Sequence, residues 1–266
     1  MKITANSSLL RSSSLLLRSS FMFALLALLV LLLPTTTTPL TVPEQNLMKM
    51  LTSPSSKAQI ESAISDVVSS PPNMTFLDPA TNPKLRGLWE LLYQTAPKTS
   101  SPVQRFLTTS LKADSFSESI PYNTDSSVKV FQEIKTKSID IIVQPKSSKS
   151  NNLTVTALSG STSAPPPNWS ERENDGKLLG LNVLGVSKTN TPPPPSPYGD
   201  IRVIFLFDSG SFNINGLKIA YPVPFRSKLF RDNVKGWLDH VYLSEDLRIC
   251  QGNKGTTFVL KRVQNN

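Results

Sequence analysis

The chain ends in three short runs of β-branched and aromatic residues, and these runs constrain its fold more than any other feature. They are Lys235–Leu243, Leu247–Gln251 and Thr256–Leu260. Gly252–Gly255 joins the last two as a four-residue turn. Runs this short, joined by turns and with no long helix between them, predict antiparallel strands.

Seven earlier segments have the same character and are bounded by turn residues. They are residues 84–95, 127–134, 138–145, 152–158, 177–186, 200–208 and 216–221. With the three C-terminal runs they make roughly nine or ten strands, which we expect to form an antiparallel sheet that closes on itself.

Strict alternation of side chains predicts which residues share a face of a strand. In the first strand, one face carries Trp89, Leu91 and Tyr93. In the Lys235–Leu243 strand, one face carries Trp237, Val241 and Leu243. In the strand that follows, one face carries Arg248 and Cys250.

Two capping boxes predict short helices outside the strands. Ser56–Gln59 begins a helix that keeps apolar residues at helical spacing as far as Val68. Ser101–Gln104, with proline at the first helical position, begins a second helix. Two proline-rich segments are expected to project as extended loops, residues 159–175 and 187–199.

The first 58 residues have the composition of a targeting leader. Phe21–Leu33 is an unbroken run of thirteen apolar residues that follows a basic stretch. As a helix it would be about 20 Å long, shorter than a bilayer core of about 30 Å, which favours a signal-like segment over residues 1–34. Residues 35–58 are rich in Ser, Thr and Pro and contain one acid, Glu44, which is typical of a transit peptide.

These patterns divide the chain into three parts. We expect a leader over residues 1–58, a helix and linker over residues 59–83, and a β domain over residues 84–264. An uncleaved signal anchor is the alternative interpretation of the apolar run.

The net charge of +9 does not indicate nucleic-acid binding. Residues 1–58 contribute +4 of it, and the other 208 residues contribute +5 without a run of Lys or Arg longer than two. Nucleic-acid-binding domains gather basic residues into a stripe. We therefore expect no nucleic-acid partner, whereas weak attraction to anionic lipid headgroups fits this charge.

The sequence offers no constellation for catalysis or metal binding. The single histidine, His240, lies in a strand beside Asp239 and is interpreted as a surface or wall residue. The single cysteine, Cys250, excludes an internal disulfide and a multi-cysteine zinc site, and is interpreted as a small strand hydrophobe. Glu245 and Asp246 are adjacent at a turn, which favours a turn or salt-bridge role. We expect no enzyme, metal or cofactor.

The C-terminal runs also carry an ordered signature. It consists of Tyr242-Leu243, Asp246-Leu247-Arg248-Ile249, Gly252-Asn253-Lys254-Gly255 and Phe258-Val259-Leu260. This signature resembles the C-terminal pattern of the plastid-lipid-associated protein (fibrillin) family, with Cys250 in place of the usual Ser and Gln251 in place of the usual Arg. The first strand is similar to the opening motif of the family through Gly87, Trp89, Leu92 and Tyr93. The resemblance covers about residues 84–263.

The resemblance implies a lipocalin-like antiparallel β-barrel with one or two short flanking helices. It further implies a non-enzymatic protein that binds lipophilic molecules, such as quinones, carotenoids or acyl lipids, at plastoglobules or thylakoids. In that light the two leader segments predict a bipartite signal and transit leader into a plastid, with a secreted or endomembrane location as the alternative. The resemblance does not identify the lipid or the residues that bind it.

Two other functions stay open. The first is an accessory interaction protein that supports a prenyl-lipid biosynthetic enzyme, with the barrel interior filled by side chains. The second is a barrel enzyme that acts on a lipid through His240 and nearby carboxylates.

Trp89 and Arg248 are predicted to meet inside the sheet. In lipocalin-type barrels, the Trp of the first-strand Gly-x-Trp closes one end and an Arg from a late strand packs across it. First and last strands are neighbours when a sheet closes, so a guanidinium can lie against the indole ring. The alternative is that Arg248 pairs with Glu245 or Asp246 at the surface.

We predict that residues 1–58 act as an address. A fluorescent protein fused to this segment is expected to enter the plastid, because a basic and apolar segment precedes a Ser/Thr-rich one. Accumulation of the fusion in the medium or the endoplasmic reticulum would contradict the plastid prediction.

Overall fold

A computed structural model of the protein describes residues 40–70, 76–95, 128–146, 150–165, 192–220, 235–253 and 255–264. The chain divides into two compact units, residues 1–39 and 40–266, and all of the described residues belong to the second. Three features expected from the sequence lie outside the described residues: most of the leader, the helix from Ser101 and the strand over residues 177–186. Parts of both proline-rich segments also lie outside them.

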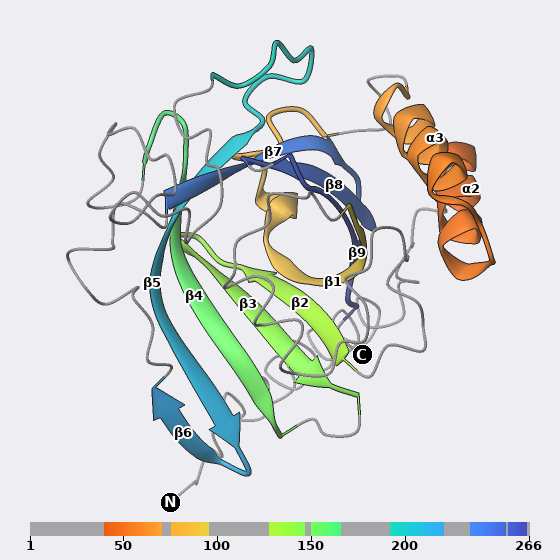
Figure 1. The fold of residues 1–266 in the computed structure, drawn as a ribbon. Coiled ribbons are helices and arrows are strands. Elements are labelled where there is room, and N and C mark those ends of the chain that lie inside the picture. The colour runs from red at the N-terminus through yellow and green to blue at the C-terminus, as the bar shows by residue number, and fades with distance from the viewer. Residues whose placement is uncertain are drawn as a thin grey trace, which may run out of the picture. The chain divides into compact units, whose positions relative to one another are not determined.

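Nine antiparallel strands form one sheet in the described part of the chain (Figure 1). They are β1 (Gly87–Gln94), β2 (Val128–Ile134), β3 (Ser138–Pro145), β4 (Asn152–Ser161), β5 (Arg202–Ile214), β6 (Leu217–Ala220), β7 (Lys235–Leu243), β8 (Leu247–Gly252) and β9 (Thr257–Arg262). Their order is β4-β3-β2-β1-β9-β8-β7-β5-β6, and β4 also pairs with β5. All strands except β6 therefore form a closed ring, which confirms the predicted sheet that closes on itself.

The strand β5 completes the ring because it pairs on both sides. Its first residues, Arg202 to Leu206, pair with β7 on one side, while β4 pairs with most of its length on the other side. On the side where β7 pairs with its first residues, its last residues, Ser211 to Ile214, pair with β6. Asn215 and Gly216 connect β5 to β6 with positive φ angles of 50° and 87°, which suits the two-residue Asn-Gly hairpin turn.

A β-bulge in β1 changes the face on which Tyr93 lies. The register between β1 and β9 shifts between Leu91 and Tyr93. Trp89 and Leu91 pack in the cluster inside the ring, whereas Tyr93 packs in the cluster under the helices. The prediction that all three share a face is wrong, because the extra residue of a bulge rotates the side chains that follow it.

A second bulge, in β7, has the same effect. The register between β7 and β8 shifts between His240 and Tyr242. Leu243 consequently packs in the inner cluster, and Val241 packs against the outer one. The predicted shared face of Trp237, Val241 and Leu243 is therefore wrong for the same reason. The strand β8 has no such shift, and its alternation is as expected, with Leu247 and Ile249 in the outer cluster and Cys250 in the inner one.

Two helices, α2 (Val42–Thr52) and α3 (Lys57–Val68), lie outside the ring beside β8 and β9 (Figure 1). The predicted capping box of α3 is confirmed, since Ser56 and Gln59 each accept a hydrogen bond from the backbone N–H of the other. The helices pack against the outer face of four strands. The contact cluster consists of Leu47, Leu51, Ile60, Ala63, Ile64 and Val67 on the helices and Tyr93, Tyr242, Leu247, Ile249 and Val259 on the strands.

The helix α2 lies in the stretch that composition assigned to the leader. The Glu44 side chain is almost completely buried, accepts from the Thr41 backbone N–H at 2.7 Å and accepts from the Ser244 hydroxyl at 2.5 Å. Leu47 on the same helix is fully buried. The Ser and Thr residues that suggested a transit peptide partly serve as helix caps. No helix in the described ranges is long and apolar enough to cross a membrane.

We predict that Leu47→Ala lowers the free energy of unfolding by about 2–5 kcal/mol, because it leaves a cavity between α2 and the sheet. Leu77→Ala is the matched control: Leu77 is 62% exposed, and its truncation is expected to change stability by less than about 0.5 kcal/mol. Chemical denaturation of the two variants measures the difference. Equal effects would mean that α2 is not packed on the sheet.

Candidate functional site

The closed ring gives every strand an inner and an outer face. Since α2 and α3 lie outside, the side chains that alternate with their contact cluster point inward. The strand register extends this inner face around the ring: Trp89 lies opposite Gln132, Gln132 opposite Ile141, and Ile141 opposite Val155.

The inner face is predominantly apolar. One buried cluster on it consists of Leu85, Trp89, Leu91, Ile134, Ile139, Val203, Leu238, Leu243, Cys250 and Leu260. Val130, Ile141, Phe205 and Phe258 also point inward by register, yet these side chains are only half-buried. Apolar side chains that point into a closed sheet and keep contact with solvent leave surface that an apolar ligand can cover.

Arg248 lies on this face and is fully buried. Its guanidinium carbon is 5.1 Å from the centroid of the Trp89 ring, which confirms the predicted contact. Its Nη2 donates to Oε1 of Gln132 at 2.5 Å. The alternative pairing with Glu245 is replaced by an ion pair of Glu245 with Lys84 at 2.6 Å.

The electrostatic surroundings of Arg248 are unfavourable for its charge. Burial lowers the pKa of Arg248 to about 10, and the nearby Arg262 cation also lowers it, whereas Cys250 acts in the raising direction. The guanidinium still carries its charge at neutral pH. Within the described part of the chain, its Nε and Nη1 atoms are buried and have no hydrogen-bond partner.

His240 lies opposite Cys250 on the neighbouring strand and is also fully buried. Burial lowers the pKa of His240 to about 3, the Arg248 cation acts in the same direction, and the backbone carbonyls of Ile201 and Leu238 act against both. The ring is therefore neutral at physiological pH. Neither ring nitrogen has a hydrogen-bond partner within the described residues.

Cys250 behaves as the strand hydrophobe expected from the sequence. It is fully buried in the inner cluster, and burial raises the pKa of its thiol to about 11. A protonated, buried thiol is a poor nucleophile. Across the described ranges, no group of three His, Cys, Asp or Glu side chains is placed to hold a metal ion.

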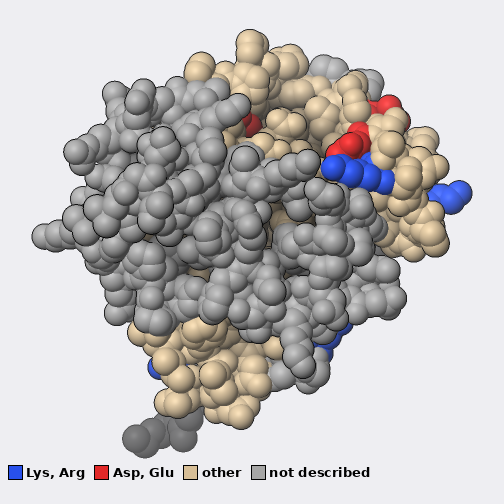
Figure 2. Space-filling model, in the orientation of Figure 1, with Lys and Arg blue, Asp and Glu red and all other residues tan. Residues whose placement is uncertain are grey.

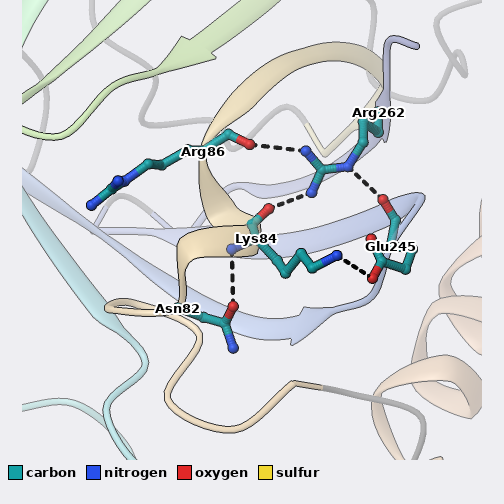
Figure 3. A network of polar contacts seen from close by, with 5 residues as sticks. All are labelled: Asn82, Lys84, Arg86, Glu245 and Arg262. Atoms are coloured by element: carbon teal, nitrogen blue, oxygen red, sulfur yellow. Dashed lines mark hydrogen bonds and ion pairs between the residues drawn. The ribbon is translucent and has the colours of Figure 1, made fainter. Parts of the chain in front are cut away.

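Arg262 lies at one end of the ring, which we call the η2 end after the short helix η2 (Pro83–Leu85) that lies there (Figure 3). Its guanidinium carbon is 4.2 Å from the Trp89 centroid. Its Nε donates to the Glu245 carbonyl at 2.5 Å, its Nη1 donates to the Arg86 carbonyl at 2.9 Å, and its Nη2 donates to the Lys84 carbonyl. The Trp89 indole N–H donates to the Leu85 carbonyl at 2.9 Å.

Gly87 is required at this end of the ring. Its φ angle is +124°, and a Cβ atom there would lie 2.9 Å from Nη1 of Arg262. Sequence reasoning identified Gly87 and Trp89 but missed Arg262, which lies two residues beyond the end of the family signature.

The remaining signature residues have structural positions. Leu92, Tyr93, Tyr242 and Leu247 contact the helix-covered cluster, and Leu243 and Phe258 belong to the inner face. The Asp246 carbonyl accepts from the Arg262 backbone N–H. Gly252, Asn253 and Gly255 form the predicted hairpin turn, with Gly255 at a φ angle of +79° and its N–H donating to the Gly252 carbonyl. Lys254 lies outside the described residues.

A buried ion pair on the outer face joins β5 to β7. Arg202 donates from Nε and Nη2 to the two carboxylate oxygens of Asp239 at 2.6 and 2.7 Å. The same guanidinium lies 3.7 Å from the centroid of Trp237. Sequence reasoning noted Asp239 in an apolar strand but had no means of finding a partner 37 positions away.

Charged side chains of the described residues are mixed in sign on the face shown in Figure 2, where blue and red atoms lie beside one another. Elsewhere among the described residues, Lys129 pairs with Glu90 and Lys135 pairs with Asp140. The face in view therefore has no basic stripe within the described part of the chain.

Comparisons with known proteins agree with the signature. A family model described as PAP_fibrillin matches residues 200–261. The chain is 32% identical over 190 residues to an Arabidopsis thaliana protein named Probable plastid-lipid-associated protein 12, chloroplastic. The alignment covers 70% of this chain and 34% of that protein, so this chain matches about a third of the length of its relative. No solved structure matches the chain.

We predict that His240 makes the protein less stable as the pH falls from about 6.5 towards 3. Its folded pKa is lowered to about 3 and the unfolded value is near 6.5, so the unfolded chain binds the proton first and stability falls by up to about 1.4 kcal/mol per pH unit. His240→Leu is expected to lose this dependence. Because the chain has a single histidine, denaturation of both proteins at about pH 7 and 5 isolates the effect. Parallel losses of stability would contradict it.

Proposed function

The chain belongs to the plastid-lipid-associated protein (fibrillin) family, and from this premise we propose that it binds a lipophilic molecule on the inner face of its closed sheet. The observation that carries the proposal is the apolar inner face with its half-buried side chains, among them Ile141 and Phe205. Quinones, carotenoids and acyl lipids are the ligand classes that we propose. The role needs binding only, so we propose a non-enzymatic protein.

We propose a plastid location, which the name of the chloroplastic relative supports. The packing of α2 against the sheet supports a shorter address than composition suggested. We propose that the address ends before residue 40 and that the mature domain keeps both helices.

We propose that the hairpin of β5 and β6 contacts a lipid surface, such as that of a plastoglobule or thylakoid. Ile214, Leu217 and Ile219 are large apolar residues that are 49, 66 and 45% exposed, and Lys218 is exposed between the last two. Apolar side chains beside a cation suit the boundary between acyl chains and anionic headgroups.

We predict that the double variant Leu217→Ser, Ile219→Ser binds vesicles of plastid-like anionic lipid more weakly than the unchanged protein. Flotation measures the partition coefficient, which is expected to fall about tenfold. The matched control is Leu77→Ser, which changes an equally exposed leucine elsewhere. Equal flotation of all three proteins would exclude the hairpin as the contact.

The inner-face proposal is tested by two adjacent isoleucines of β3. Ile141 points inward and Ile142 outward, and both are half-buried. We predict that Ile141→Trp reduces the lipid that co-purifies with the protein to about a tenth or less, because the indole occupies the ligand surface. Ile142→Trp is expected to leave it unchanged. Mass spectrometry of solvent extracts measures the lipid.

The outcomes separate the proposal from its alternative. Near-stoichiometric lipid that is lost only with Ile141→Trp supports binding on the inner face. An empty protein that co-purifies with a biosynthetic enzyme would contradict it and support the accessory role.

A further inference from the structure

We propose that the inner face selects a lipophilic ligand with an ionised carboxylate headgroup and that Arg248 binds this carboxylate at the η2 end. The inference rests on the proposed function, since it names the class of ligand for the same site. The ligand is then a long-chain carboxylic acid.

The two arginines beside Trp89 differ in how their hydrogen-bond donors are used. All three guanidinium nitrogens of Arg262 donate to backbone carbonyls, so its donors are engaged in holding the η2 end together. Arg248 donates to one acceptor among the described residues, the side-chain oxygen of Gln132. Its Nε and Nη1 atoms carry three N–H donors and are buried without a partner among the described residues. Buried donors of this kind are usually satisfied, so those of Arg248 point to an acceptor from outside the chain.

The balance of charge around Arg248 also favours an anion. Arg262 is a second cation near Arg248, while His240 and the Cys250 thiol are neutral at physiological pH. Of the acids nearby along the chain, Asp239 pairs with Arg202 on the outer face and Glu245 pairs with Lys84 at the rim. Burial lowers the pKa of Arg262, and Glu245 and Asp246 act on it in the raising direction. A buried guanidinium without a carboxylate among the described residues is complementary to an anion, and a carboxylate matches its planar donors.

The position of Arg248 along the ring suits a headgroup with a long chain. Arg248 is the second residue of β8, at the η2 end, where Leu85 and Trp89 pack in the inner cluster. Ile141 lies near the middle of β3, and Val143 and Leu153 lie further towards the opposite edge of the ring. When the headgroup is bound at Arg248, the hydrocarbon chain of the ligand can therefore lie along the apolar inner face of strands β2 to β4. The N–H of the neutral His240 ring is a second donor for the headgroup.

The test compares stearate with methyl stearate, which share a chain and differ in charge. The full protein is stripped of lipid, and affinities are measured at about pH 8 by displacement of a fluorescent probe. Stearate is expected to bind at least about tenfold more tightly, because only the carboxylate pairs with Arg248. Arg248→Gln is expected to abolish this preference while changing the affinity for methyl stearate by less than about twofold. Arg86→Gln, which removes an exposed cation at the same end, is the control and should keep the preference.

A measurement on the unchanged protein covers the case in which Arg248→Gln does not fold. A buried pair resists salt, so the preference for stearate should persist at about 0.5 M salt, where pairs at the surface are screened. Equal affinities for the two ligands, loss of the preference in salt, or its loss in Arg86→Gln would each overturn the carboxylate proposal and leave lipid binding intact. Failure of both ligands to bind would overturn the binding of an acyl chain on the inner face.

Discussion

The structure depends on the closure of the sheet through β5. This strand pairs with β4 and β7 at once, and the buried Arg202–Asp239 pair beside Trp237 reinforces its contact with β7. Closure leaves the ring without exposed edges and divides every strand into an inner and an outer face. The outer face under α2 and α3 becomes ordinary core. The inner face is surrounded by strands on all sides, and it is the surface on which a ligand can be selected.

Trp89 links the architecture to the proposed chemistry. One arginine beside it, Arg262, is fully engaged with backbone carbonyls and fastens η2 and the β7–β8 turn to the end of β9. The other, Arg248, is buried with donors left over. A buried, incompletely paired cation lowers stability, and proteins tend to keep such groups where they serve binding. Of the two arginines beside Trp89, Arg262 therefore has a structural role and Arg248 is suited to bind a ligand.

Local patterns predicted most of the strands, because β-branched runs and turn residues act over a few positions. The contact of Arg248 with Trp89 was also predictable, since closure makes the first and last strands neighbours. The bulges at Tyr93 and Tyr242 were not, because a bulge depends on the partner strand and leaves no mark in the alternation of one strand. The helix α2 was missed because its Ser, Thr and Pro residues suit both a transit peptide and helix caps. Arg262 and the Arg202–Asp239 pair depend on contacts between distant segments, which a single sequence does not reveal.

The central claim is that the inner face, and not the outer one, contacts the lipophilic ligand. Methyl NMR with a doxyl-labelled methyl stearate tests it directly, because Ile141 and Ile142 are adjacent in the chain and lie on opposite faces of β3. Stronger paramagnetic broadening of the Ile141 methyl signals than of the Ile142 methyl signals is the result that the claim predicts, because the broadening falls steeply with distance from the label. Stronger broadening of the Ile142 signals than of the Ile141 signals would place the lipid on the outside of the sheet and contradict the claim.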